Sequence, residues 1–430
     1  MTTHASPTQS RDKDRLGRNF WRLLAASAVS NLGDGIVRTA IPLLAITLTR
    51  DPVLVGGLTA LSFLPWLLFA IPSGALVDRM DRRRAMSMAN LVRAAVVGGL
   101  VVAIAIDEVS LVLLYVLTFV LGVAETVYDS AARAMLPQVV RRDQLDRGNG
   151  PLAAAEVVTQ AFLAAPIGSF LFAWLVIAPF AGSAAVYLLA ALLILSITGN
   201  LRPVREGQAE TGPTTIRAEI REGLRWLRKH ELLRGLAVIV GLIAATETMA
   251  SSLLVLYVVD TLGVPERAFG VFLVSAGLGG LLGGLSAPRI AAKLGRIATI
   301  VVASAITSAA TLGMGLTANA WVGTVFFGLV GFAISVFNVL VISLRQALIP
   351  ERLFGRVQGA YRTLVWGLIP LGALSGGLLA KFSSVPITFV ISGIAQLMLT
   401  VLCWRLFRRH REQIQAAYQL DPEPAASESR

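Results

Sequence analysis

Apolar runs long enough to cross a bilayer recur along almost the whole chain. About 20 apolar residues span the hydrocarbon core as a helix, and a helix pairs its own backbone polar groups where no water is present. Only 15% of the residues are charged, against roughly 25% in soluble proteins. The sequence therefore predicts an all-α membrane protein with twelve transmembrane helices, over residues 20–48, 54–77, 85–106, 109–132, 151–177, 180–200, 232–259, 267–288, 297–318, 320–344, 356–381 and 385–407.

The positively charged residues indicate how these helices are oriented. Short cytoplasmic loops carry the excess of Lys and Arg, and all but five of the 38 such residues fall in the tails and in alternate loops. The exceptions are Arg38, Arg50, Arg93, Arg267 and Lys381. This asymmetry predicts that both termini are cytoplasmic, in what we expect to be the inner membrane of a bacterium.

The same distribution accounts for the formal net charge of +12. Basic residues in short loops are what topology requires, so nucleic-acid binding is not predicted. The one cysteine, Cys403, leaves no disulfide or cysteine metal site within a chain. The three histidines, at positions 4, 230 and 410, lie outside the membrane interior, so a proton carrier there has to be a carboxylate.

The spans also lack the residue patterns of catalysis. They contain no metal-ligand cluster and no nucleophile beside a base, and the chain has no GxxxxGK[ST] phosphate loop. No catalytic residue, metal or cofactor is therefore predicted, and the chain is not expected to be an enzyme or an ATP-driven pump.

The chain divides at its longest polar stretch, residues 201–231. Within that stretch, Ile216, Ile220, Leu224 and Leu227 recur at helical spacing beside a stripe of arginines, which predicts an amphipathic helix on the membrane surface. The expected organisation is a disordered tail, a six-helix bundle, a cytoplasmic linker, a second six-helix bundle and a second disordered tail, at residues 1–18, 19–200, 201–231, 232–409 and 410–430.

Three pairs of similar segments occur in the same order in the two halves. GALVDR (residues 74–79) is similar to GLSAPR (284–289), and MLPQVV (135–140) is similar to LIPERL (348–353). The third pair is APIGSFL (165–171) and IPLGALS (369–375). Matched segments in one order predict a duplicated six-helix unit, and hence two pseudo-symmetric bundles.

Glycines mark where helices are expected to approach one another closely. The run GLGGLLGG, residues 277–284, predicts close backbone contact in the eighth span. In the first span, Gly33 and Gly35 flank Asp34 and leave space for a substrate or a neighbouring helix.

The stretch GALVDRMDRRR, residues 74–84, follows the second span. It resembles the signature Gly-x-Leu-Ala-Asp-Arg-x-Gly-Arg-Arg/Lys of the major facilitator superfamily, and the matching residues are Gly74, Leu76, Asp78, Arg79, Arg82 and Arg83. Asp81 stands where the signature has a glycine in a tight turn. Because Asp tolerates left-handed backbone better than most residues, we expect the turn to be kept.

Two further segments are similar to particular branches of this superfamily. ARAMLPQVV followed by QLDRGN resembles the twelve-helix exporters that include macrolide efflux pumps and the enterobactin exporter. APIGS, which contains Pro166 and Gly168, resembles the Gly-Pro-x-x-Gly-Gly signature of antiporters, with Ala165 before the proline and Ser169 after Gly168. The resemblance implies the superfamily fold and an export function.

Asp78 ends the second span on the inner face. A carboxylate there can lie against the positive end of a helix dipole and pair with arginine, worth about 0.3–1 kcal/mol when exposed. The resemblance implies a partner near Gly355 and Arg356, at the start of the eleventh span. We expect Asp78 to latch one conformation of the protein, and a solvated topology loop is the alternative.

Charged residues inside the spans are the candidates for function, because each costs roughly 2.5–3.5 kcal/mol on insertion. In the superfamily, spans one, four, seven and ten line a central cavity, and four carboxylates of this chain fall on such spans. Asp34 and Glu247 lie near the midplane, where substrate and ion sites of such folds lie. The candidates for proton coupling or the substrate cavity are Asp34, Arg38, Glu125, Asp129 and Glu247.

Asp34 is the first candidate for the proton-sensitive group, with Arg38 one helical turn away as the cation that tunes its protonation. Glu125 and Asp129 share one helix face, and two like charges so placed favour protonation of one of them.

The alternative for these carboxylates is a permanent ion pair with Arg38, Arg93 or Arg133. Glu156, in the fifth span, is expected to be structural and to neutralise Arg93.

Together these features predict a secondary transporter. The first hypothesis is a proton-coupled exporter of lipophilic or amphipathic small molecules, such as drugs or siderophore-like metabolites, that works by alternating access. Its partners are the substrate, protons and the lipid bilayer, and it is expected to act as a monomer. Uptake of a small nutrient and flipping of a lipid or lysolipid are the alternatives on the same fold.

Overall fold

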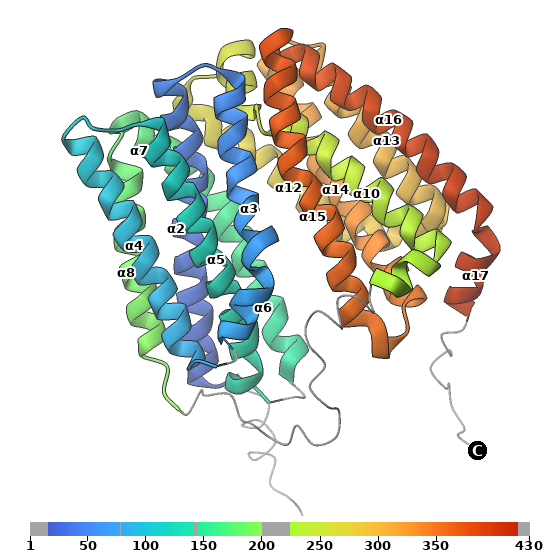
Figure 1. The fold of residues 1–430 in the computed structure, drawn as a ribbon, viewed down its shortest axis with the longest axis horizontal. Coiled ribbons are helices and arrows are strands. Elements are labelled where there is room, and N and C mark those ends of the chain that lie inside the picture. Colours follow the sequence, from blue (N-terminus) through green and yellow to red (C-terminus); the bar gives the residue numbers. More distant parts are fainter. Residues whose placement is uncertain (1–15, 78, 142–143, 200–223, 420–430) are drawn as a thin grey trace, which may run out of the picture. The chain divides into compact units, whose positions relative to one another are not determined.

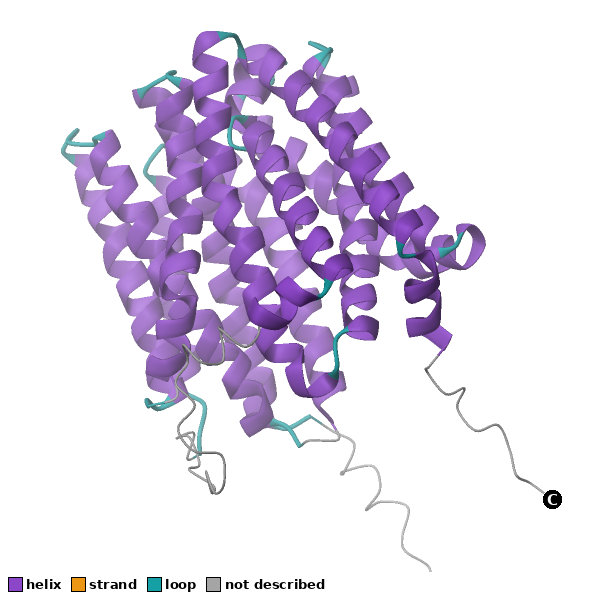
Figure 2. Ribbon diagram, turned by 45° about the vertical axis from the view of Figure 1, so that its right-hand side comes forward, coloured by secondary structure: helices purple, strands orange, loops and turns teal. Residues whose placement is uncertain are grey.

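A computed structural model describes residues 16–77, 79–141, 144–199 and 224–419. Every regular element in these residues is a helix (Figure 2). The predicted linker helix lies mostly outside the described residues, and residues 224–229 at its end are helical. The predicted all-α fold is confirmed for the described part of the chain.

Helices occupy all six spans predicted for the first half. They are α2 (Arg18–Leu48), α3 (Pro52–Val77), α4 (Arg82–Ala105), α5 (Leu111–Val139), the run α6 (Leu145–Val157), η2 (Val158–Ala164) and α7 (Ala165–Trp174), and α8 (Ala178–Leu195). The segment η2 is a π-helix that ends directly before α7, in which Pro166 occupies the first turn. Proline has no N–H to donate there, which favours a break in regular α-helical bonding.

The second half repeats this pattern. Its helices are α10 (Glu231–Ser251), α11 (Leu254–Leu256), the π-helix η3 (Tyr257–Thr261), α12 (Glu266–Leu294), α13 (Arg296–Gly315), α14 (Ala320–Leu348), α15 (Glu351–Phe382), α16 (Val385–Arg409) and the short α17 (Arg411–Gln419).

Among the described residues, 11 helical segments are long and apolar enough to cross a membrane. The predicted span that is not among them is α2, which carries Asp34 and Arg38 in its middle. At about 1.5 Å per residue, its 31 residues are nevertheless longer than a bilayer core is thick.

The chain divides into two compact units. Unit 1 comprises Met1–Leu44 and Leu68–Glu206, and unit 2 comprises Ala45–Leu67 and Gly207–Arg430. In unit 1, α4 packs on α8 and α5; in unit 2, α13 packs on α16 and α14 (Figure 1). The third helix of each half therefore packs on the sixth and the fourth, as a duplicated six-helix arrangement requires.

Residues 45–67 join unit 2 through ion pairs near the start of α3. Arg50 pairs with Asp260, and Nζ of Lys381 lies 3.1 Å from Asp51 Oδ2. Asp51 also accepts a hydrogen bond from the backbone N–H of Val53 at 2.8 Å. That backbone bond and the Lys381 ammonium lower the pKa of the Asp51 carboxyl.

Asp81 keeps the turn after α3 in a different way from the one expected. Its backbone is extended, with φ −62° and ψ 119°, rather than left-handed. Its side chain accepts hydrogen bonds from the backbone N–H groups of Arg83 and Arg84, so it caps the start of α4. A capping carboxylate thus replaces the flexibility that a glycine would supply at this position.

Glycines bring α12 and α14 into backbone contact, as the run at 277–284 predicted. A Cβ at Gly279 would lie 2.0 Å from the carbonyl oxygen of Gly328, and one at Gly283 would lie 2.2 Å from that of Phe332. Both distances are far below any real contact. In lipid, where the hydrophobic effect does not drive helices together, close packing of this kind contributes to their association.

We predict that Gly283→Ala lowers the stability of the protein by about 1–3 kcal/mol, because the added methyl group forces α12 away from α14. Gly280→Ala is the matched control. Its Cβ would meet only the Gly331 carbonyl oxygen, at 3.7 Å, which is an ordinary contact. Thermal unfolding of both purified variants in detergent measures the effect, and equal melting temperatures would contradict the prediction.

Candidate functional site

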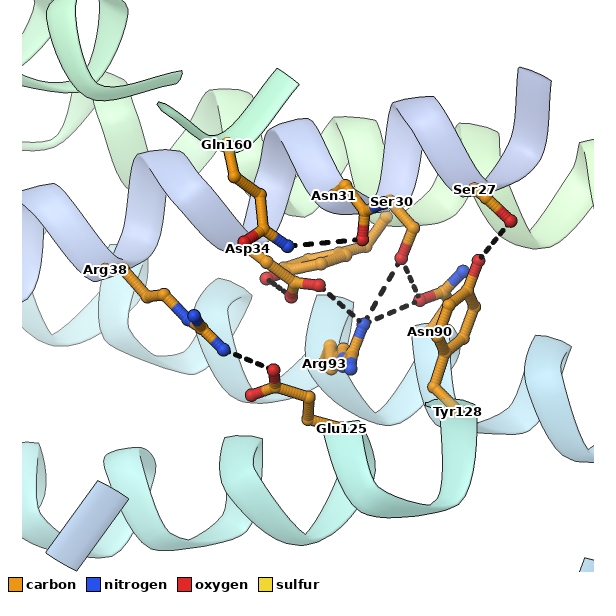
Figure 3. A network of polar contacts seen from close by, with 11 residues as sticks. Ser27, Ser30, Asn31, Asp34, Arg38, Asn90, Arg93, Glu125, Tyr128 and Gln160 are labelled. Atoms are coloured by element: carbon orange, nitrogen blue, oxygen red, sulfur yellow. Dashed lines mark hydrogen bonds and ion pairs between the residues drawn. The ribbon is translucent and has the colours of Figure 1, made fainter. Parts of the chain in front are cut away.

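Polar side chains from α2 and α4 converge on Arg93 in the interior of unit 1 (Figure 3). Arg93, on α4, is only 1% exposed. Its Nη1 lies 3.2 Å from Oδ2 of Asp34 on α2 and also donates to Ser30 Oγ at 3.2 Å and Asn90 Oδ1 at 3.4 Å. Ser30 in turn donates to Asn90 at 3.0 Å. One guanidinium therefore joins two helices through charge and hydrogen bonds.

Both oxygens of Asp34 are engaged. The Tyr187 hydroxyl, on α8, donates to Oδ1 at 2.7 Å, and Arg93 holds Oδ2. The Asp34 side chain is 10% exposed. A buried carboxylate is tolerated only where an opposite charge and hydrogen bonds offset its lost hydration. Through the two oxygens of one side chain, Asp34 thus links α2 to both α4 and α8.

The Arg93 guanidinium also lies against two aromatic rings. Its Cζ is 4.9 Å from the Tyr128 ring centroid and 5.6 Å from that of Tyr187, within the range of cation–π attraction. Nη2 of Arg93 and Nδ2 of Asn90 are buried and make no hydrogen bond with the described residues. An unpaired buried donor costs roughly 1–3 kcal/mol. These two donors therefore offset part of the stability that the other contacts of the network contribute.

A second ion pair lies on the same side of α2. Arg38 pairs with Glu125 of α5 (Figure 3). The Arg38 side chain is 57% exposed and that of Glu125 is 19% exposed. One turn further along α5, Asp129 lies 3.9 Å from Arg133. Asp34, Glu125 and Asp129 therefore each have an arginine partner, which is the arrangement that the sequence left open as an alternative.

The partners of Asp34 and Arg38 differ from those expected. Although the two residues lie one turn apart on α2, Asp34 contacts α4 and α8 whereas Arg38 reaches across to α5. The expected pairing of Asp34 with Arg38 is therefore wrong. The cation beside Asp34 is Arg93, and it is Asp34 rather than Glu156 that neutralises Arg93.

Three residues of the network were not predicted. Asn90 lies one turn before Arg93 on the same helix face, and Ser30 lies one turn before Asp34, so helical spacing from the buried charges could have found both. Tyr187 has no such signal, because it is a lone tyrosine in an otherwise apolar span.

The glycines around Asp34 leave space for neighbouring helices. A Cβ at Gly33 would meet the Tyr187 ring at 3.0 Å, and one at Gly35 would lie 2.5 Å from the Ala164 Cβ in η2. On α7, a Cβ at Gly168 would lie 3.1 Å from the Ile36 carbonyl oxygen of α2. The antiporter-like segment with Pro166 and Gly168 thus packs directly against the helix that carries Asp34.

Unit 2 contains a cavity of about 270 Å³ beside Glu247 of α10. Its lining is mostly apolar, with Ile243, Phe337 and Trp366 among the walls. Nε2 of Gln396 donates to Oε2 of Glu247 at 2.9 Å. The described lining residues include no lysine, arginine or histidine, so Glu247 has a hydrogen-bond partner but no cation beside it.

The signature at residues 74–84 is only partly visible. Asp78, the expected latch, lies outside the described residues, as do the side chains of its expected partners Gly355 and Arg356. Nη1 of Arg83 donates to the Ile197 carbonyl oxygen at 2.9 Å. A Cβ at Gly74 would meet no atom of the described residues within 4 Å.

Within the described residues, no group of three or more His, Cys, Asp and Glu side chains could hold a metal ion. The ion pairs described among the predicted site residues of unit 1 are those of Asp34, Glu125 and Asp129 with arginine.

The family profile described as Major Facilitator Superfamily matches residues 23–373. The chain belongs to this superfamily. It is accordingly a multi-pass membrane transporter with the major facilitator fold rather than an enzyme.

Known proteins of the superfamily match most of the chain. The multidrug efflux pump Tap of Mycolicibacterium fortuitum is 28% identical over 401 residues, which cover 88% of this chain and 93% of Tap. The enterobactin exporter EntS of Shigella boydii serotype 4 (strain Sb227) is 25% identical over 408 residues, which cover 93% of this chain and 95% of EntS. These relatives confirm the predicted resemblance to the exporter branch.

Solved structures agree on the fold. A mutant of the nucleoside transporter NupG superposes with a TM-score of 0.77 at 10% identity, covering 91% of this chain and 100% of that chain. A bacterial homologue of the iron transporter ferroportin, in an inward-facing state, superposes with a TM-score of 0.71 at 18% identity. The match covers 91% of this chain and 99% of that chain.

We predict that Asp34→Asn and Arg93→Gln each lower the free energy of unfolding by about 3–5 kcal/mol, because each leaves a buried charge without its partner. The double variant removes both charges and is expected to cost clearly less than the sum of the two. Chemical unfolding of the purified variants in detergent measures all three. Strictly additive losses would show that the ion pair is not energetically coupled.

Two tyrosines provide a matched control for the hydrogen bond to Asp34. Tyr187→Phe removes a bond to a charged group and is expected to cost about 1.5–3 kcal/mol. Tyr128→Phe leaves the ring against Arg93 and removes hydroxyl contacts to the neutral side chains of Ser27, at 3.5 Å, and Ser30, so a smaller loss is expected.

Proposed function

We propose that this protein is a proton-coupled exporter of lipophilic or amphipathic small molecules that works by alternating access. Relatives named for multidrug efflux and for enterobactin export support export as the direction of transport and a broad range of substrates. The observation that carries the proposal is the buried Asp34 carboxylate, which is held by an arginine and a tyrosine from two other helices.

Asp34 supports the proton-coupled part. A proton on this carboxylate removes the ion pair with Arg93 and converts one oxygen from an acceptor into a donor. Arg93 then keeps Ser30 and Asn90, which already accept from it at 3.2 and 3.4 Å. Proton binding therefore changes which helices of unit 1 are held together, which is the physical requirement for linking a proton to a conformational change.

Glu125 offers the proton a more accessible acceptor. Its side chain is 19% exposed against 10% for Asp34, and its partner Arg38 is largely exposed. Asp129, one turn away on α5, extends this group of carboxylates further toward solvent, at 34% exposure. We infer that a proton enters at these residues before it reaches Asp34.

Glu247 and its cavity support the choice of substrate. A carboxylate in an apolar cavity with no cation beside it is costly when ionised. It therefore favours either a proton or a positively charged group of a bound molecule, while the surrounding apolar walls favour the rest of an amphipathic substrate. The proposed substrates are lipophilic molecules, with cations preferred in the Glu247 cavity.

The topology completes the proposal. Both termini lie in the cytoplasm of a bacterial cell, the bundles at 19–200 and 232–409 are joined by the linker 201–231, and the working unit is a monomer. Asp78, with Arg79, Arg82 and Arg83 of the same signature, latches one conformation.

We predict that purified protein in vesicles moves dyes, antibiotics or siderophores against their gradient only while a proton gradient is imposed. Glu125→Gln is expected to lose this driven transport and to keep substrate exchange without a gradient, because it still binds substrate but no longer carries a proton. Glu108→Gln, an exposed carboxylate between α4 and α5, is the matched control and retains both.

Normal driven transport by both Glu125→Gln and Asp34→Asn would rule out these residues as the coupling groups. Transport in the reverse direction favours nutrient uptake, and movement of a fluorescent phospholipid between leaflets favours lipid flipping.

We also predict that Glu247→Gln weakens the binding of a lipophilic cation by roughly tenfold or more, because a charge pair in an apolar site is lost. An uncharged analogue of the same shape is expected to bind both proteins equally. Equilibrium binding to protein in detergent measures the two affinities, and an equal loss for both ligands would contradict a charge interaction.

A further inference from the structure

A second cavity of unit 2 lies away from Glu247, at one end of the membrane helices. Its volume is about 800 Å³, and its walls come from the turn between α12 and α13, the last turns of α16, and α17. Both α13 and α16 are membrane-spanning candidates, and the cavity adjoins the first residues of α13 and the last of α16. It therefore lies where the spans end, at the depth of lipid headgroups.

The charged residues described in the lining of this cavity are all of one sign. Arg296, Arg408 and Arg411 line it, and no aspartate or glutamate is among these lining residues. Glu231, near this end, pairs with residues outside the lining, since Arg409 Nη1 lies 3.3 Å from its Oε1 and His410 Nε2 lies 3.8 Å from its Oε2. Glu412, in the first turn of α17, is not among the lining residues. Three guanidinium groups around one cavity favour a multiply bonded anion.

The start of α13 adds to this preference. Arg296 is its first residue, and the preceding Gly295, with φ +82°, makes no side-chain cap. The first N–H groups of a helix have no partner within it, and they carry partial positive charge toward the cavity that Gly295, Arg296 and Ile297 line.

The remaining walls are apolar. Trp404 is 43% exposed and Val302 is 45% exposed, and both line the cavity together with Val301 and Phe407. The Arg408 guanidinium lies 5.5 Å from the Trp404 ring. Tryptophan beside arginine is typical of the membrane interface, where one end of a side chain meets lipid tails and the other meets headgroups.

We propose that this cavity binds an anionic phospholipid. The headgroup phosphate bonds Arg296, Arg408 and Arg411, and the acyl chains run along Val302 and Trp404 into the bilayer. A soluble phosphate would satisfy the arginines but leave the apolar walls unused, so the combination favours a lipid. A bound lipid joins α13, α16 and α17, and it thereby stabilises the end of unit 2 that carries the C-terminal helix.

The test uses the purified full-length protein, freed of native lipid and placed in nanodiscs of phosphatidylcholine with or without phosphatidylglycerol. We expect phosphatidylglycerol to raise the melting temperature and to remain bound in native mass spectrometry. The variant Arg296→Gln/Arg408→Gln/Arg411→Gln is expected to lose most of this shift and most of the retained lipid.

The matched control is Arg289→Gln/Lys293→Gln/Arg405→Gln, which removes the same charge from exposed positions on α12 and α16 outside the cavity. This control variant is expected to show the same rise in melting temperature and the same retained lipid as the unaltered protein. If the triple cavity variant does not fold, Arg408→Gln and Arg411→Gln are tested singly, and each is expected to reduce the shift.

Three outcomes would overturn the proposal. They are an equal melting temperature with and without phosphatidylglycerol, an undiminished response in the cavity variants, and a full shift with inorganic phosphate or glycerol phosphate, which would indicate an anion site without a lipid.

Discussion

The buried ion pair between Asp34 and Arg93 organises the polar interior of unit 1. Helices in a bilayer gain little from apolar contact, because lipid tails are as apolar as the side chains they replace. Charge and hydrogen bonds therefore contribute a larger share of the specificity of packing. Through this pair, α2 is joined to α4, and through Tyr187 it is also joined to α8. The Arg38–Glu125 pair adds α5, and Gln160 of η2 donates to Asn31 at 3.4 Å. Polar contacts therefore link α2 to α4, α5, α8 and η2.

The two halves share an arrangement of helices but differ in the polar side chains at equivalent helix contacts. Where α4 meets α8 in unit 1, the partners of Asp34 are an arginine and a tyrosine. Where α13 meets α16 in unit 2, Ser304 and Thr400 share a hydrogen bond of 2.6 Å between neutral hydroxyl groups. The duplicated arrangement thus has an ion pair near this contact in unit 1 and neutral hydroxyl groups at the equivalent contact in unit 2. We consider this division suited to separate proton and substrate sites.

The fold could be predicted from the sequence because the membrane restricts the choices. Apolar runs of the right length have to be helices, and the helices found occupy the predicted spans. The charged residues of the site could also be identified, since each is costly in lipid. Their partners could not, because spacing along α2 identifies neighbours on that helix alone. Arg93 reaches Asp34 from another helix, and Tyr187 does so 153 residues away in the chain. Asp81 is a similar case, because a turn can be kept by a cap as well as by a flexible backbone.

The contact between Gly35 and Ala164 restricts how unit 1 can rearrange. A Cβ at Gly35 would lie only 2.5 Å from the Ala164 Cβ, so α2 and η2 pack closely at this point. Axial sliding would drive Ala164 into the larger residues on either side of Gly35. A change that follows the proposed protonation of Asp34 therefore involves side chains alone, or moves α2 and η2 together. Gly35 thus limits the ways in which α2 can move relative to η2.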